Sequence, residues 1–435
     1  MVDPVSRIET VSGSARERWA LVIVLCLVHL VSSIDRHVLT LVLEPVGKDL
    51  RLADTQLGFV QGTAYVALYA IAILPFGILL DRINRKLILL LCLILWSVGT
   101  AVCALAQSFE ALVAGRMLIG LGQASVVPAA MSMIAGAFAD RPFGRPVAAF
   151  TASATLGRGI ALFGGGGLLI WLAGSETFQA LDELEPWRRL LLLSLIANAI
   201  VLVAVVAFGL SDLPRMERVR ELAISQVLLA NWPRYVTYLG CAVATVMSIQ
   251  VIAAWTPTVF VRTFAIAPAE SGLLVGGLVL ALGAVGNLSG GVALDSFSRN
   301  GKRAATPIVM IIALSGAMIM ALMLCLADHI VIAAFAFGGA TLCLGAATPL
   351  AIEAIQRLTP AKFRARVTAG FVLVVTLLSL GIGPVWVGWL SENAYPGPHS
   401  LNHAMLTVLT IAGMLGLTSA VTASLLGDVA ERRPA

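Results

Sequence analysis

Charge is scarce in this sequence. Only 12% of the 435 residues are charged and 59% are hydrophobic, with a mean hydropathy of +0.94. Soluble chains are about one quarter charged, so an ordinary water-soluble fold is excluded. Apolar runs of about 18 residues or more recur along the whole length, and each is long enough to cross a bilayer. Because these runs do not alternate polar and apolar residues as barrel strands would, we expect an all-α integral membrane protein.

Catalytic and metal-binding motifs are also missing. The sequence has no GxSxG nucleophile elbow, no HExxH zinc motif and no phosphate-binding P-loop. Its six cysteines all lie inside apolar runs without CxxC spacing, which favours buried thiols over metal or redox chemistry. The run Gly164–Gly167 lacks a lysine that would bind phosphate, and small residues of this kind allow close helix packing in membranes. We therefore expect no enzymatic activity, no metal and no cofactor.

Twelve apolar runs are long enough to span a membrane. They cover residues 18–43, 55–80, 87–107, 110–139, 146–173, 187–211, 231–262, 269–294, 306–326, 330–359, 366–391 and 400–426. With both termini cytoplasmic, most of the 29 lysine and arginine residues lie on the cytoplasmic side, as the positive-inside rule requires. This distribution accounts for the net charge of +5 and leaves no basic patch for nucleic acid. The short loops favour a multi-pass protein of a bacterial inner membrane.

The chain divides into two similar halves. The predicted organisation is a cytoplasmic N-terminal tail (1–17), a six-helix bundle (18–211), a cytoplasmic linker (212–230), a second six-helix bundle (231–426) and a cytoplasmic C-terminal tail (427–435). Each half repeats one pattern, in which Gly77 is followed by Asp81 and Gly291 by Asp295. Repeated halves with a site at their interface are typical of secondary transporters, so we expect two pseudo-symmetric six-helix bundles.

The loop between the second and third spans carries a family resemblance. GILLDRINRK (77–86) resembles the signature loop of the major facilitator superfamily, with Asn84 where glycine is usual. Five further stretches resemble the Spinster branch of that superfamily: IDR (34–36), RMLIGLGQAS (116–125), EPWRRLLLL (185–193), AAWTPTVFVRTF (253–264) and LGIGPVWVGWLSE (380–392). The resemblance implies an alternating-access transporter, with a lysophospholipid or a sphingoid phosphate as substrate. Organic-anion symporters elsewhere in the superfamily also carry an Asp-Arg pair in the first span.

The signature loop and its repeat are predicted to form a cytoplasmic gate. Arginines on this side set the topology whatever else they do, but Asp81 adds nothing to that signal. The superfamily resemblance implies that Asp81 meets positive groups or helix ends of the other half, where a helix N-terminus favours a carboxylate. For Glu353 a gate salt bridge and a proton role stay open. The residues assigned to the gate are Gly77, Asp81, Arg82, Arg85, Lys86, Asp295 and Glu353.

A few charged residues lie within the spans, including Asp35 and Arg36 in the first and Arg116 in the fourth. Each costs about 2.5–3.5 kcal/mol near the middle of a bilayer on insertion scales, so we expect them to face the protein interior. Asp35 lies about 100° round the helix from Arg36, so the two side chains meet different neighbours. We expect Asp35 to pair with Arg116 and to act as a proton switch, holding Arg116 when ionised and releasing it when protonated. The alternative is a purely structural ion pair.

Four residues are assigned to substrate binding: Arg36, Arg116, Gln123 and Arg158. Arginine is well shaped for phosphate or carboxylate. Arg158 stands where the superfamily usually has no charge, and its alternative role is to extend to the cytoplasmic interface. Spinster-like proteins usually carry glutamate where this chain has Gln123, and glutamine cannot carry a proton. Proton coupling is therefore expected to be weakened, to depend on Asp35 alone, or to be absent.

Together these features predict a secondary transporter that moves an amphiphilic anion by alternating access and is coupled to protons through Asp35. The alternative within this class is a proton-driven transporter of small organic anions or drugs. A non-transporting membrane sensor is a further alternative from another class. The expected partners are a small-molecule or lipid substrate, protons and membrane lipids, and the expected state is a monomer.

Overall fold

The computed structural model describes residues 15–80, 82–138, 144–174, 184–208, 229, 231–299, 305–360 and 363–426. Its helices are α1 (Ala15–Leu41), α2 (Leu43–Leu50), α3 (Asp54–Gln61), α4 (Thr63–Leu79), α5 (Arg85–Ala104), α6 (Phe109–Gln123), α7 (Val126–Ala137), α8 (Gly144–Gly174), α9 (Pro186–Ala207), α11 (Trp232–Phe264), α12 (Pro268–Arg299), α13 (Ala305–Leu326), α14 (Ile330–Leu358), α15 (Arg364–Asn393) and α16 (Ser400–Leu425). Within this part of the chain, 12 spans are long and apolar enough to cross a membrane, which confirms the predicted all-α membrane fold. Most of the predicted tails (1–17 and 427–435) and linker (212–230) lies outside the described residues, so these boundaries stay predictions.

Two of the predicted spans are each divided into two helices. The second span consists of α3 and α4, which are separated at Gly62, and the fourth consists of α6 and α7. A Cβ atom at Gly62 would lie 2.2 Å from the carbonyl oxygen of Leu380 in α15, so only glycine allows α15 to approach this closely. The apolar run continues across the break, and hydrophobic periodicity therefore does not reveal it.

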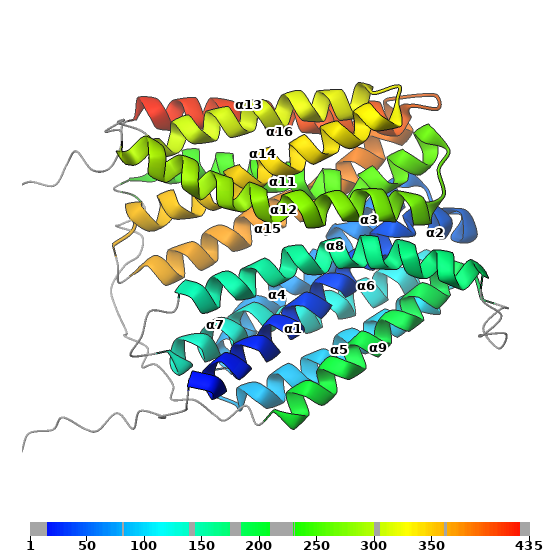
Figure 1. Cartoon of the computed structure of the whole chain (residues 1–435), viewed down its shortest axis with the longest axis horizontal. Helices are drawn as coiled ribbons and strands as arrows, with labels where there is room; N and C mark the ends of the chain where they lie inside the picture. Colours follow the sequence, from blue (N-terminus) through cyan, green and yellow to red (C-terminus); the bar gives the residue numbers. More distant parts are fainter. Residues whose placement is uncertain are drawn as a thin grey trace, which may run out of the picture.

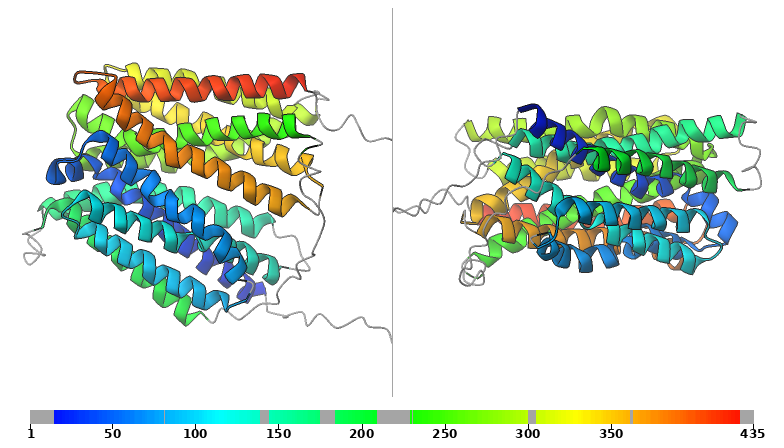
Figure 2. Two further views of the ribbon diagram at one scale, coloured as in Figure 1. Left: turned by 180° about the vertical axis from the view of Figure 1, so that it is seen from behind. Right: turned by 90° about the horizontal axis from the view of Figure 1, so that it is seen from below.

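The helices form two halves, α1–α9 and α11–α16, which lie side by side (Figure 1). The first and last described residues lie on the same side of the molecule, called the terminal side below, and the other is called the opposite side (Figure 2). The repeated glycines Gly77 and Gly291 both lie near the terminal-side ends of their helices, α4 and α12. This placement agrees with the predicted pseudo-symmetry.

The two halves pack closely on the opposite side. A Cβ atom at Gly388 in α15 would lie 2.2 Å from the carbonyl oxygen of Asp54, and one at Gly166 in α8 would lie 2.5 Å from that of Ala269. Towards the terminal side the halves diverge (Figure 1), and Cβ atoms at Gly77 and Gly370 would find nothing within 4 Å among the described residues. The structure is therefore closed between its halves on the opposite side.

Candidate functional site

The charged turn of α1 lies at the centre of the molecule. α1 packs against α8 and α9 of its own half and also reaches α11 and α12 of the other. Ile23 and Leu27 near its start are exposed, but no residue of α1 after Leu27 is exposed. Asp35 and Arg36 therefore face protein and not lipid, as intramembrane charges are expected to do.

Asp35 is 3% exposed and accepts hydrogen bonds from two neighbouring helices. Thr100 Oγ1 of α5 donates to Oδ2 at 2.6 Å, and Asn198 Nδ2 of α9 donates to the same oxygen at 3.0 Å. Ser194 Oγ, also in α9, donates to Oδ1 at 3.1 Å. Three neutral donors thus satisfy this carboxyl group within the first half.

The predicted ion pair between Asp35 and Arg116 is not formed among the described residues. Arg116 is 1% exposed, and its guanidinium donates to three backbone carbonyls: Val60 at 3.0 Å, Arg36 at 3.3 Å and Gln61 at 3.3 Å. The break between α3 and α4 explains this correction, because the last carbonyls of a helix have no donor within it. Arg116 supplies donors at the end of α3, and its role in proton coupling or substrate binding stays a prediction.

Arg36 and Arg158 differ from Arg116 because neither side chain forms a hydrogen bond or an ion pair with any residue that the structure describes. In both, the Nε atom is buried without an acceptor. The Arg36 guanidinium lies 5.3 Å from the centre of the Tyr65 ring, which is a cation–π contact. α8 packs against α1 next to Arg158, where a Cβ atom at Gly157 would lie 2.4 Å from the Leu30 carbonyl oxygen. Two cations without an acid partner among the described residues thus lie on the neighbouring helices α1 and α8, an arrangement that suits an anion.

The position of Arg158 on α8 favours an interior role over one at the membrane interface. Leu156 and Ile160, two residues before and after Arg158, are both exposed. At about 100° per residue they lie on the face of the helix away from Arg158. Gly157 packs against the Leu30 carbonyl of α1, while Gly159 packs against Leu280 of α12. Arg158 therefore lies on the inner face of α8, between elements of the two halves.

Gln123 is bonded at both ends of its amide. Its Nε2 donates to the carbonyl of Ser32 in α1 at 3.0 Å, and its Oε1 accepts from the hydroxyl of Tyr65 in α4 at 3.1 Å. A carboxylate in this place has no proton to donate to Ser32, whereas a protonated carboxyl group does. Gln123 thus joins α1, α4 and α6, and substrate binding by it stays a prediction.

Two of the residues assigned to the terminal-side gate have described contacts within their own halves. Lys86 Nζ donates to the Val206 carbonyl of its own half at 2.9 Å, and Glu353 forms an ion pair with Arg357 one helical turn away. Asp295 is exposed on α12, and Arg85 is buried. Asn84 caps α5 by accepting from two backbone N–H groups, which explains why asparagine suits the position. Asp81 lies outside the described residues, so the gate stays a prediction.

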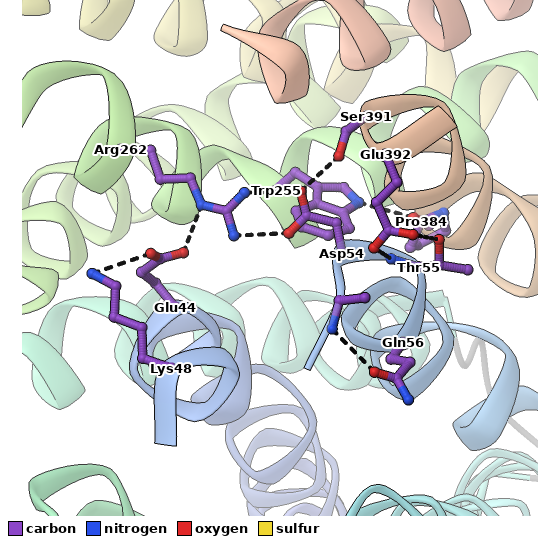
Figure 3. Close-up of polar contacts among 11 residues, drawn as sticks. Glu44, Lys48, Asp54, Thr55, Gln56, Trp255, Arg262, Pro384, Ser391 and Glu392 are labelled. Carbon is purple, nitrogen blue, oxygen red and sulfur yellow. Dashed lines mark hydrogen bonds and ion pairs between the residues drawn. The ribbon is translucent and has the colours of Figure 1, made fainter. Parts of the chain in front are cut away.

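A polar cluster that no motif in the sequence indicates joins the halves on the opposite side (Figure 3). Arg262 at the end of α11 contacts Glu44 of α2 and Asp54 of α3. Thr55 in α3 also donates to Glu392 in α15. The only signal in the sequence is a charge at each of these span ends, and it does not say which ends meet.

Comparison with known proteins places this arrangement in a family. The model of the Major Facilitator Superfamily matches residues 25–384. The chain belongs to this superfamily. It is similar to an MFS-type efflux pump of Mycolicibacterium smegmatis, at 25% identity over 92% of this chain and 91% of that protein. It is also similar to protein spinster homolog 1 of Xenopus tropicalis, at 25% identity over 93% of this chain and 80% of the relative.

Solved structures share the fold. A bacterial homologue of the human lysosomal transporter Spinster, in an inward-facing and unoccupied conformation, has a TM-score of 0.79 at 20% identity, over 95% of this chain and 99% of that one. The nucleoside transporter NupG has a TM-score of 0.69 at 11% identity, over 93% of this chain and 98% of that one. These findings confirm the Spinster resemblance. The protein is a multi-pass membrane transporter related to Spinster, not an enzyme, and such transporters carry small molecules.

Proposed function

We propose that this transporter moves an amphiphilic anion, such as a lysophospholipid or a sphingoid phosphate. The proposal is carried by the two interior arginines, Arg36 and Arg158, whose buried Nε atoms have no acceptor among the described residues. A cation that is partly withdrawn from water without an acid partner is costly, and a ligand with an anionic headgroup would offset that cost. Phosphate and carboxylate are the groups that guanidinium binds best.

An apolar wall beside the cations supports the amphiphilic part of the proposal. Leu280 of α12 faces Gly159, the residue after Arg158. Residues 273–285 of α12 include no polar or charged side chain. A ligand can therefore place its headgroup on the first half and an acyl or sphingoid chain along the second. The substrate class depends on these residues and on the resemblance to the Spinster branch.

A binding series tests the substrate class. The purified transporter is titrated with lysophosphatidate, with glycerol phosphate, which lacks the chain, and with lysophosphatidylcholine, which lacks the net charge. We expect lysophosphatidate to bind best and Arg36→Met and Arg158→Met to abolish its advantage over lysophosphatidylcholine. Arg357→Met removes an exposed terminal-side arginine and is the matched control. Equal affinity of all three ligands, or an equal loss in the control, would refute the proposal.

Proton coupling through Asp35 forms a second part of the proposal. Asn198 supports it, because its Nδ2 donates to Asp35 while its own Oδ1 is buried without a partner. A rotated amide would present that oxygen to a protonated Asp35, so the same neighbour can serve both protonation states. Uptake into proteoliposomes under an imposed pH gradient tests this. Uptake that keeps its pH dependence in Asp35→Asn would remove Asp35 from the coupling.

The second candidate function is proton-coupled export of drugs or small organic anions. The similarity to the mycobacterial efflux pump over most of both chains favours it. It predicts that chain-free organic anions bind as tightly as lysolipids in the series above. A non-transporting sensor stays the least favoured hypothesis, and alternate labelling of cysteines placed on both sides of Arg36 would contradict it.

The orientation is also proposed. We place the terminal side in the cytoplasm of a bacterial inner membrane, with the chain acting as a monomer, so that the present state faces inward. The positive-inside distribution of the sequence supports this orientation. An impermeant thiol reagent applied to intact cells should label a cysteine at Gln107, on the opposite side, and should not label one at Asn84.

A further inference from the structure

Arg262 forms the densest polar contact between the two halves. Its Nη1 and Nη2 donate to the two carboxylate oxygens of Asp54, each at 2.8 Å, and its Nε donates to Glu44 at 2.6 Å (Figure 3). The arginine belongs to the second half and both acids belong to the first. Paired N–H···O bonds of this geometry are the strongest hydrogen bonds that side chains form.

The same cluster also joins α3 to α15. Ser391 of α15 donates to Asp54 Oδ2 at 2.6 Å, while Thr55 donates through its backbone N–H and its hydroxyl to Glu392 of α15 at 2.9 and 2.5 Å. The first two residues of α3 therefore hold two helices of the second half, α11 and α15, at once.

The cluster is partly withdrawn from solvent, which strengthens it. The exposed fraction is 29% for the Arg262 side chain, 10% for Glu44 and 12% for Asp54. Beneath them the backbone of Gly388 lies directly against the Asp54 carbonyl. Ion pairs are weak at an exposed surface and gain when water is excluded and the geometry is bidentate.

We infer that Arg262 is a latch of the transport cycle, which holds the transporter closed on the opposite side and must separate from Asp54 and Glu44 each time that side opens. The latch sets the balance between the two open states and takes no part in recognising the substrate. This role of Arg262 requires alternating access but no particular substrate, so it can be tested independently of the substrate proposed above.

The contacts predict a graded effect of its members. Asp54 takes two of the three Arg262 hydrogen bonds and a further one from Ser391, so Asp54→Asn should weaken the latch more than Glu44→Gln does. Lys48 lies 3.3 Å from Glu44 and already shares its charge. Arg262→Lys keeps the charge and loses the bidentate geometry, and should fall between the wild type and Arg262→Gln.

Distances across the opposite side test the latch. Spin labels on cysteines at Gln107 in the first half and Asp328 in the second, both exposed, report how far the halves separate there. Arg262→Gln should raise the ratio of open to closed molecules about tenfold or more, since a charge-assisted hydrogen bond contributes about 1.5–3 kcal/mol and 1.4 kcal/mol is a factor of ten.

Arg188→Gln is the matched control. Arg188 is another opposite-side arginine in an ion pair, but its partner Asp49 belongs to the same half. An unchanged distance distribution in Arg262→Gln, or an equal shift in Arg188→Gln, would overturn the inference. If Arg262→Gln does not fold, the same distance measurement is made on Arg262→Lys and Glu44→Gln. Both variants should raise the ratio of open to closed molecules, and an unchanged ratio in both would overturn the inference.

Discussion

Replacing Arg158 with methionine should have two effects of opposite sign. In the protein without ligand, Arg158 is a half-buried cation whose buried Nε has no acceptor among the described residues. An unsatisfied buried donor costs about 1–3 kcal/mol, and methionine keeps the length of the side chain without that donor. Arg158→Met should therefore raise the free energy of unfolding of the ligand-free protein by about 1–3 kcal/mol.

The same substitution should weaken the binding of an anionic lysolipid. A hydrogen bond from a guanidinium to a phosphate contributes about 1.5–3 kcal/mol, which corresponds to about a ten- to hundredfold change in Kd. Thermal unfolding of the purified protein, with and without lysophosphatidate, measures both effects in one experiment. The midpoint should rise without the ligand, and the shift that the ligand causes should shrink.

A rise in stability together with a loss of ligand affinity distinguishes a binding residue from a structural one. Unsatisfied groups at functional sites reduce the stability of the folded protein, so removing one increases it. If Arg158 only supported the fold, Arg158→Met would lower the midpoint and leave the ligand-induced shift unchanged. That result would refute the assignment of an anion site to Arg158, and it would leave the packing of α8 as its sole role.

Three further predictions follow from the same contacts. Arg116→Met should lower the free energy of unfolding by at least about 2 kcal/mol, because the carbonyls of Val60 and Gln61 lose their donor, and a raised midpoint in denaturation would contradict this. Asn198→Leu should shift the pH dependence of uptake, because Asn198 donates to Asp35. Its lysolipid affinity should stay within about threefold of the wild type, because Asn198 contacts neither unpaired arginine. An unchanged pH profile of uptake would contradict a role of Asn198 in coupling. Gln123→Glu should be more stable at pH 5 than at pH 8 relative to the wild type, because only the protonated side chain can donate to the Ser32 carbonyl, and equal stabilities in thermal denaturation would show that another donor serves Ser32.

The membrane fold could be predicted from the sequence because lipid constrains the chain so strongly. Each of the 12 observed spans overlaps a predicted apolar run, since helix length and apolar composition decide where a chain crosses. The breaks within the second and fourth spans could not be predicted. The break at Gly62 depends on how closely α15 approaches, which is a property of the assembled halves and not of the local sequence.

The candidate site was predictable only in part. The cost of intramembrane charge identified Asp35, Arg36 and Arg158 as interior residues, and helical periodicity separated the directions of the first two. Periodicity does not say which neighbour a face meets, so the proposed partner of Asp35 was wrong and its actual partners in α5 and α9 were missed. The contact between Asp54 and Arg262 joins residues far apart in the sequence at two unremarkable span ends, where no local pattern marks it.

The separation of Asp35 from Arg116 limits how a proton on Asp35 could act. A switch that releases Arg116 would need a direct contact, but Arg116 is bound to backbone carbonyls of α1 and α3. Protonation of Asp35 would instead alter its hydrogen bonds with Thr100 and Asn198, which belong to α5 and α9 of the same half. Arg116 also donates to the carbonyl of Arg36, so it would hold the backbone of the α1 turn in place while those helices respond. Under the proposed coupling, protonation therefore repacks the first half around a fixed Arg36, and the anion site keeps its geometry while access to it changes.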